Sequence, residues 1–541
     1  MTQASARGPS AHSWSVGSLS CNGRASLLID TGCGLAAFAS VLQEIYYFKP
    51  QTILVSVTFL TVVAYPLGEA LAFIIPRKGK IGHILNPFPF NSKEHAAICV
   101  MASSSAVAAV STEILAAQKL FYNETPSPGA AIFLVISSQL LGMGIAGLLR
   151  PVLTRPTRML WPINLPINSL LETLHRDKKE TKQRLRLFWI VFAVLFVWEI
   201  IPEWMFPLLQ GFSIFCLANK HSMVFTNLFG GSQGNEGLGF LAISFDWQYV
   251  ASTGSPLWYP LQTLVNSFTG YMLCIVVFMG IYYGNIWESK NFPFLSQLLY
   301  DGSVSNATAF AEYNITNILN AKNEIDPVAL QANGIPYLTG TYVAYLITTN
   351  MGSTATIVHL FLWNYDDIKA GWAWASPANL RKVLDPKKWR FWERGESKQE
   401  WQQRVLADDT VDPHYKIMVR NGYDEVPNWW YGIVLILSFF IGLGTLYAIN
   451  SSLPWWGYIL ANMFAAVFIL AFGSQYGLTG FQFNQQPIVQ MLAGYLHPRK
   501  PLANMYFTVF GSYHRTKRCI QKANIFQASM ESNKDSCSRV T

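Results

Sequence analysis

The sequence predicts an all-α polytopic membrane protein, a helical bundle that also contains broken or re-entrant segments. Of the 541 residues, 51% are hydrophobic and only 13% are charged, whereas a soluble domain has about 25% charged residues. Long apolar runs recur along the chain, and about 20 apolar residues are enough to cross a bilayer. These observations together exclude an ordinary soluble core.

Nine apolar runs are long enough to be candidate membrane helices. Between them, around residues 209–256, the two shorter pieces 211–218 and 237–250 flank a Gly-rich stretch. We expect interrupted helices or a re-entrant hairpin there, because irregular backbone is tolerated at membrane depth only where protein covers it or water lines it. The nine candidate runs are residues 30–48, 53–75, 96–118, 130–149, 187–209, 257–283, 337–363, 430–449 and 455–472.

One membrane domain is expected over residues 30–511. Residues 1–29 are Ser-rich and are predicted to form a disordered tail, and residues 512–541 are polar, without a membrane-length apolar run. The loop 364–428 is the one sizeable polar insertion in the sequence. We therefore expect a single bundle with a polar tail at each end.

Charge distribution predicts the orientation of the bundle. Residues 150–186 hold nine Lys/Arg against three acids and residues 364–428 hold eleven Lys/Arg, so both loops should be cytoplasmic. The acidic loop 285–336 carries two glycosylation sequons. With further sequons at Asn123 and Asn450, all four fall on the non-cytoplasmic side if the N-terminus is cytoplasmic.

Signatures of other protein classes do not occur in the sequence. There is no GxxxxGK[ST] or HExxH motif, and the seven cysteines form no CxxC or zinc-type spacing. The Gly-rich stretch 230–234, GGSQG, is preceded by no predicted strand and lies in no βαβ unit, so we interpret it as a flexible break between helices. We therefore predict no catalytic residues, no metal site and no cofactor. The net charge of +8 comes from bases in the loops, so positive-inside topology explains it better than a nucleic-acid partner.

The stretch 85–122 joins a kinked, charged loop to a membrane-length helix. Its prolines remove backbone donors and push the preceding residues into extended conformations, and we expect the predicted helix 96–118 to follow directly. A charged mouth of this kind suits a gate or vestibule at a bilayer surface. The gate residues are Asn86, Pro87, Pro89, Phe90, Asn91, Lys93, Glu94 and His95.

Polar groups inside apolar spans are costly unless they pair or line a cavity. Glu113 could take up and release a proton, with Gln118 and Tyr122 hydrogen-bonding a peptide-like substrate, or it could simply be satisfied by a neighbouring helix. Asp246 follows the broken segment, where ion and substrate sites occur, but Asp also caps helices well.

Three further polar residues lie on late segments. Asn350 and His359 belong to the span 337–363, and His359 is either a proton relay or a histidine bonded between packed helices. Gln485 belongs to an amide-rich stretch that could donate to and accept from a peptide backbone, or could be buried against other helices.

Several motifs resemble those of the oligopeptide transporter family, in its peptide branch. Residues 86–95, NPFPFNSKEH, look like the family's NPGPFNxKEH, with Phe88 in place of its glycine. The likeness runs from about residue 32 to residue 511. It continues, in the family's order, at residues 117–122, 159–165, 228–232, 244–247, 355–359, 425–431 and 494–505.

The resemblance implies a bundle of membrane helices that couples uptake of short peptides, glutathione-like in some members, to inward proton movement. The proton gradient would then be the energy source, the bilayer and small peptides the partners, and the plasma membrane the expected location, with vacuolar or endosomal membranes as alternatives. The sequence does not predict an oligomeric state. After residue 511 the family's further motifs are missing, so a truncated, non-transporting fragment or a regulatory partner of a full-length transporter is the alternative.

Overall fold

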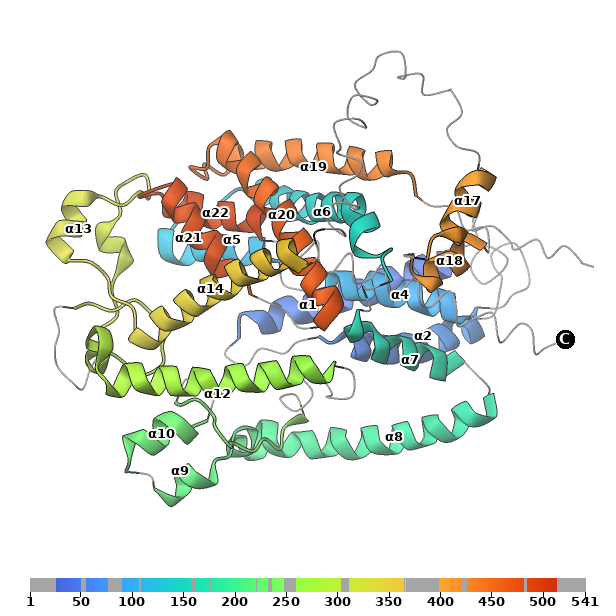
Figure 1. Cartoon of the computed structure of the whole chain (residues 1–541), viewed down its shortest axis with the longest axis horizontal. Coiled ribbons are helices and arrows are strands. Elements are labelled where there is room, and N and C mark those ends of the chain that lie inside the picture. Colours follow the sequence, from blue (N-terminus) through green and yellow to red (C-terminus); the bar gives the residue numbers. More distant parts are fainter. Residues whose placement is uncertain are drawn as a thin grey trace, which may run out of the picture.

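In the computed structural model, most of the described residues lie in helices (Figure 1). Within the part of the chain that it describes, extended pairing is limited to isolated bridges such as Phe212 with Ile243. The predicted all-α class is therefore confirmed. The described residues are 26–49, 55–75, 90–106, 109–157, 159, 161–175, 178–219, 221–231, 236–247, 259–302, 311–363, 365, 398–409, 411–420, 426–480 and 484–512.

The helices follow the predicted runs with small shifts at their ends. Five short helical turns lie between longer elements in the described residues: η1 (Pro162–Asn164), η2 (Ile201–Met205), η3 (Pro207–Gln210), η5 (Ile286–Asn291) and η6 (Ile315–Ile318). The main helices are α1 (Ser26–Tyr47), α2 (Val57–Ile74), α4 (Ser92–Ser105), α5 (Val110–Tyr122), α6 (Pro128–Leu153), α7 (Leu165–His175), α8 (Lys178–Ile200), α9 (Ile214–Ala218), α10 (Met223–Phe229), α12 (Leu261–Tyr283), α13 (Pro327–Asn333), α14 (Gly340–Trp363), α17 (Lys398–Ala407), α18 (Pro413–Arg420), α19 (Asn428–Ala448), α20 (Trp455–Thr479), α21 (Gln486–Leu496) and α22 (Pro501–Gly511).

Seven segments in the described residues are long and apolar enough to cross a membrane. The chain is therefore an integral, multi-pass membrane protein. Two further predicted spans form helices, α1 and α14, that are not among the seven. The seven are Val57–Ile74, Ser92–Tyr122, Pro128–Arg150, Lys182–Met205, Leu261–Tyr283, Asn428–Ala448 and Trp455–Thr479.

The predicted span over residues 96–118 falls within the span Ser92–Tyr122, and the structure divides it between α4 and α5. Helix α4 ends in three consecutive serines, and the hydroxyls of Ser103, Ser104 and Ser105 donate to backbone carbonyls three or four residues earlier. Such bonds compete with the helical ladder. Helix α5 then starts anew after Ala109, whose backbone is extended.

Two apolar cores hold the helices together. One gathers buried side chains of α5, α6, α19, α20, α21 and α22, with Phe472, Tyr458 and Phe507 among the largest. The other joins α1, α2, α4 and α7 around Leu60 and Ile98. In Figure 1 the first group occupies the upper part of the view and the second lies below and to the right of it.

Helices α6 and α19 pack closely along each other at the top of Figure 1. Small residues on α6 permit this approach: a Cβ on Gly147 would lie 2.0 Å from the Tyr431 ring, and one on Gly144 would lie 2.9 Å from Leu435. Association of membrane helices depends on such close van der Waals packing. Gly147 therefore has no room for a side chain.

The region between α8 and α12 is broken, as predicted. Pro202 lies in η2, which has a π-helical turn, and the short helices α9 and α10 follow. Helices α8 and α12 lie in the lower part of Figure 1. Only 6% of an apolar 18-residue stretch is buried in each of the spans Lys182–Met205 and Leu261–Tyr283 that contain them. Their exposed apolar side chains suit contact with lipid.

Candidate functional site

The first candidate region is the end of the gate motif. Asn86, Pro87 and Pro89 lie outside the described residues, whereas Phe90 and Asn91 lie within them. The Asn91 side chain accepts hydrogen bonds of 3.0 Å from the backbone N–H groups of Lys93 and Glu94. Asn91 is thus the N-cap of α4, which is a position that asparagine favours.

His95 is fully buried and joins three elements. Its Nε2 lies 2.8 Å from the Thr61 carbonyl oxygen on α2, and its Nδ1 lies 2.9 Å from Nε2 of His175 on α7. A carbonyl only accepts, so His95 Nε2 carries a proton and, in the neutral ring, Nδ1 accepts from His175. Two imidazolium rings would place two N–H groups against each other, so the pair holds at most one extra proton.

Aromatic rings enclose this histidine pair. The Phe90 ring centroid lies 5.6 Å from both imidazoles, and Tyr65 lies 5.4 Å from His175. A Cβ on Gly68 would lie 2.5 Å from the Phe90 ring, so glycine is needed for this packing. Burial, and secondarily the neighbouring His95, lower the pKa of His175 to about 3. Sequence reasoning missed His175, since its amphipathic helix carried no motif.

The second region lies where α1 meets α5. Glu113 accepts a hydrogen bond from the Tyr47 hydroxyl. One turn earlier on α1, the Glu44 carboxylate accepts from the backbone N–H of Ala109 and the hydroxyl of Thr112, both at 3.3 Å. A carboxylate at a helix N-terminus is favoured by the helix dipole. Sequence reasoning missed Glu44 and Tyr47, although an acid within an apolar run was the available signal.

The third region is a hydrogen-bonded chain that starts at Gln118, which is 1% exposed. Its Oε1 accepts from the Tyr506 hydroxyl on α22 at 2.5 Å, and its Nε2 donates to Glu124 at 3.1 Å. Glu124 also accepts from the Asn323 side chain at 2.7 Å. The buried end of α5 is thereby tied to the loop that precedes α13.

The fourth region is the contact between α14 and α21. The Asn350 amide donates to its own helix at Leu346 and lies 2.9 Å from the Met491 sulfur, while Asn484 donates to the Tyr345 hydroxyl at 3.4 Å. Gln485, at the start of α21, is fully buried, yet neither its Oε1 nor its Nε2 has a hydrogen-bond partner among the described residues.

The remaining predicted residues occur elsewhere. Asp246 is fully buried on the irregular segment between α10 and α12, with its backbone N–H 3.3 Å from the Ser244 hydroxyl. His359 is exposed, beside Trp363 on α14, and beyond the contact with α21. Tyr122 is half-buried at the end of α5. In the described residues, no group of three His, Cys, Asp or Glu could hold a metal ion.

Buried polar networks and interrupted helical segments within a multi-pass bundle are features that membrane transporters share. Residues 28–514 match the family described as OPT oligopeptide transporter protein. The chain belongs to this family, whose members are transporters rather than enzymes.

The chain is also similar in sequence to several named proteins. The chain is 32% identical to Oligopeptide transporter 5 of Arabidopsis thaliana over 89% of its own length and 60% of that protein. It is 33% identical to Oligopeptide transporter 1 of the same plant, over 88% of itself and 60% of the relative. It is 29% identical to the sexual differentiation process protein isp4 of Schizosaccharomyces pombe, over 87% and 56%.

The chain thus spans about 60% of the length of the first two of these relatives. No solved structure has significant similarity to it.

Proposed function

We propose that this protein transports small oligopeptides across a membrane into the cytoplasm, by symport with protons. The observation that carries the proposal is Gln485, a fully buried amide with both polar atoms unpartnered in the described residues. Leaving such a group unsatisfied costs about 1–3 kcal/mol. A ligand that both donates and accepts removes that cost.

A peptide backbone has these two properties, because each unit offers one N–H and one carbonyl. Gln485 can accept from the first and donate to the second. Asn350, Asn484 and Tyr345 add polar atoms at the contact between α14 and α21. Gln118 and Tyr122 on α5 are further candidates for substrate contact, with Gln118 held by Tyr506 until a peptide competes for it. Short peptides, including glutathione-like ones, are the substrates proposed.

One contact supports coupling to protons. Glu113 accepts a hydrogen bond from the Tyr47 hydroxyl at the contact between α1 and α5, so its protonation would change how these helices interact. The pair formed by His95 and His175 connects α2, α4 and α7, and the low pKa of His175 keeps that residue neutral at the pH of uptake. Asp246, beside the interrupted segment, and His359 are further candidates. No cofactor is proposed, since the proton gradient supplies the energy.

The gate motif fits a mouth that opens and closes. Asn91 fixes the start of α4 directly after the loop, and His95 anchors that helix to its neighbours. Lys93 and Glu94 would provide charge at the rim of the mouth, and the motif residues Asn86, Pro87 and Pro89 lie outside the described residues. We propose a plasma-membrane location with the N-terminus in the cytoplasm.

Uptake of a labelled tetrapeptide by transporter-deficient cells tests this function. Cells that express this chain are compared at about pH 5 and about pH 7.5, with and without a protonophore. Greater accumulation at the acidic pH, abolished by the protonophore, is expected. Normal surface expression without uptake would overturn the proposal.

The same experiment addresses a second role. Only 6% of the apolar stretch in each of the spans that contain α8 and α12 is buried. The exposed apolar faces of these helices could therefore contact another membrane protein as well as lipid. A regulatory partner of a longer transporter would raise or lower the uptake by a co-expressed family member, without uptake by the chain alone.

A further inference from the structure

A cavity of about 780 Å³ opens between the turn that joins α19 to α20 and the turn that joins α21 to α22. Its volume is in the range of small-ligand pockets, about 300–1,000 Å³. Asn450 is one of the residues that line the cavity. The glycosylation sequon at Asn450 predicts that this end of the bundle faces the non-cytoplasmic side of the membrane. A substrate arriving from outside would therefore meet this cavity before it reaches the middle of the bundle.

Two basic side chains, Lys500 and His497, line this cavity, and no Asp or Glu is among the described residues that line it. Lys500 is also the residue immediately before α22, and the N-terminus of a helix carries partial positive charge. The electrostatic character of the cavity therefore favours an anion.

His497 is 5% exposed, and its Nε2 has no hydrogen-bond partner in the described part of the chain. The imidazole is fixed by its neighbours, since its ring centroid lies 4.8 Å from that of Trp456. A Cβ on Gly457 would lie 2.6 Å from Nε2, so the glycine leaves room for the imidazole. Burial, and to a lesser degree Lys500, lower the pKa of His497. The ring is therefore neutral near pH 7 and can donate one N–H.

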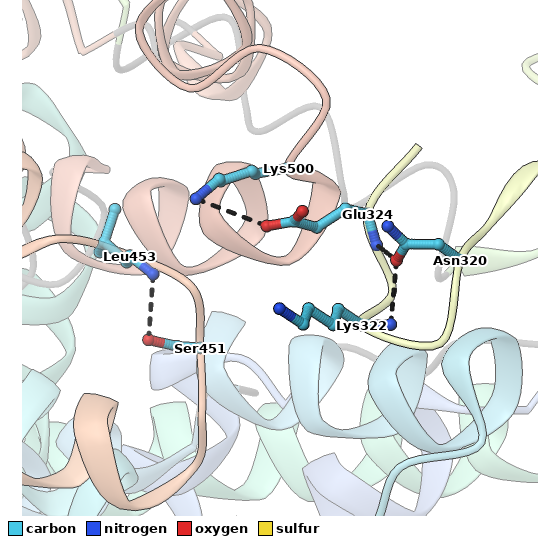
Figure 2. Close-up of polar contacts among 6 residues, drawn as sticks. All are labelled: Asn320, Lys322, Glu324, Ser451, Leu453 and Lys500. Atoms are coloured by element: carbon cyan, nitrogen blue, oxygen red, sulfur yellow. Dashed lines mark hydrogen bonds and ion pairs between the residues drawn. The ribbon is translucent and has the colours of Figure 1, made fainter. Parts of the chain in front are cut away.

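Lys500 is held by a loop that is distant in sequence (Figure 2). Its Nζ lies 3.4 Å from Oε1 of Glu324, and both side chains remain partly exposed. The Ile325 N–H donates to the Arg499 carbonyl at 2.9 Å, which fixes the loop beside the turn. An exposed pair of this kind contributes little stability, so a second carboxylate can replace Glu324 at small cost.

We propose that this cavity binds the C-terminal carboxylate of a peptide, which takes the Lys500 ammonium from Glu324 and accepts an N–H from His497. The exchange would release Glu324 and loosen the loop from the α21–α22 turn. For the identity of the substrate, this inference rests on the function proposed above.

The test compares a labelled tetrapeptide bearing a free C-terminal carboxylate with the same peptide bearing a C-terminal amide. Binding to the purified full chain is measured in phosphatidylcholine nanodiscs, where no anionic lipid competes, and uptake is measured in cells. Lys500→Gln should weaken binding of the free acid about tenfold while leaving the amide unchanged. Glu324→Gln, which removes the competing carboxylate, should strengthen binding of the free acid.

Lys322→Gln is the matched control, because Lys322 lies two residues from Glu324 in the same loop but does not line the cavity. Lys500→Arg keeps the charge and should retain the preference for the acid, which separates loss of charge from misfolding. Equal binding of acid and amide by the unmodified chain, or an unchanged preference in Lys500→Gln, would overturn the inference. Binding that depends on Lys500, without uptake, would uphold the carboxylate site and overturn the proposed transport. Uptake that is equal for the acid and the amide would uphold transport and overturn the carboxylate site.

Discussion

The Tyr506 hydroxyl on α22 donates a 2.5 Å hydrogen bond to Gln118 on α5, across 388 positions of the chain. Both side chains are buried, and the Gln118 amide also donates a hydrogen bond to the Glu124 carboxylate. A single bond thus joins α5 to α22, the last helix in the described part of the chain. This contact adds a polar link to the apolar core that early and late helices share.

Tyr506→Phe should destabilise the protein by about 1–3 kcal/mol, because it leaves the buried Gln118 oxygen without its donor. The free energy of unfolding can be measured by denaturant titration in detergent. Tyr495→Phe is the matched control, since Tyr495 on α21 is 85% exposed. Equal stability of the two variants would contradict the importance of the buried bond.

Stability should also fall with acidification because of His175. Its pKa in the folded protein is about 3, below the ordinary value of about 6.5, so the unfolded chain binds the proton first. The stabilising contribution is therefore complete above about pH 6.5 and is lost as the pH falls towards about 3.

His175→Gln keeps a donor for His95 but does not titrate, so thermal unfolding in detergent should depend less on pH between about 7 and 5. His359→Gln removes an exposed histidine instead and should leave the pH dependence as it was. If the unmodified protein and both variants showed the same dependence of thermal unfolding on pH, the histidine pair would be excluded as the source of that dependence.

Glu113→Gln should abolish the acid stimulation of peptide uptake. The Tyr47 hydroxyl can still donate to the amide oxygen, so the helix contact is retained, but the group no longer binds a proton. Uptake is compared at about pH 5 and about pH 7.5, with surface expression measured in parallel. Unchanged acid stimulation would exclude Glu113 from proton coupling.

Gln485→Leu should separate stability from function. Replacing a buried, unpartnered amide with an apolar side chain of similar size should leave the fold equally stable or stabilise it by about 1–3 kcal/mol. Peptide uptake should nevertheless fall, because the donor and acceptor are lost. Gln490→Leu makes the same change at an exposed position of α21 and should preserve uptake. Loss of stability together with uptake would point to a packing role.

Sequence alone determined the class, the approximate helix positions and the family, because these depend on apolar runs and local motifs that need no knowledge of packing. It also identified Gln118, Gln485 and His95 as polar groups worth attention. It missed their partners, Tyr506 and His175, and it merged α4 and α5 into one helix.

Only the tertiary structure decided which polar groups meet. Glu124 reaches Asn323, and Lys500 reaches Glu324, across loops whose path no local pattern predicts. Gln485 likewise follows no special motif, and only the packing of α21 leaves it buried without a described partner. The physical reason is that burial and pairing are properties of three-dimensional neighbours, whereas periodicity and composition are properties of the chain.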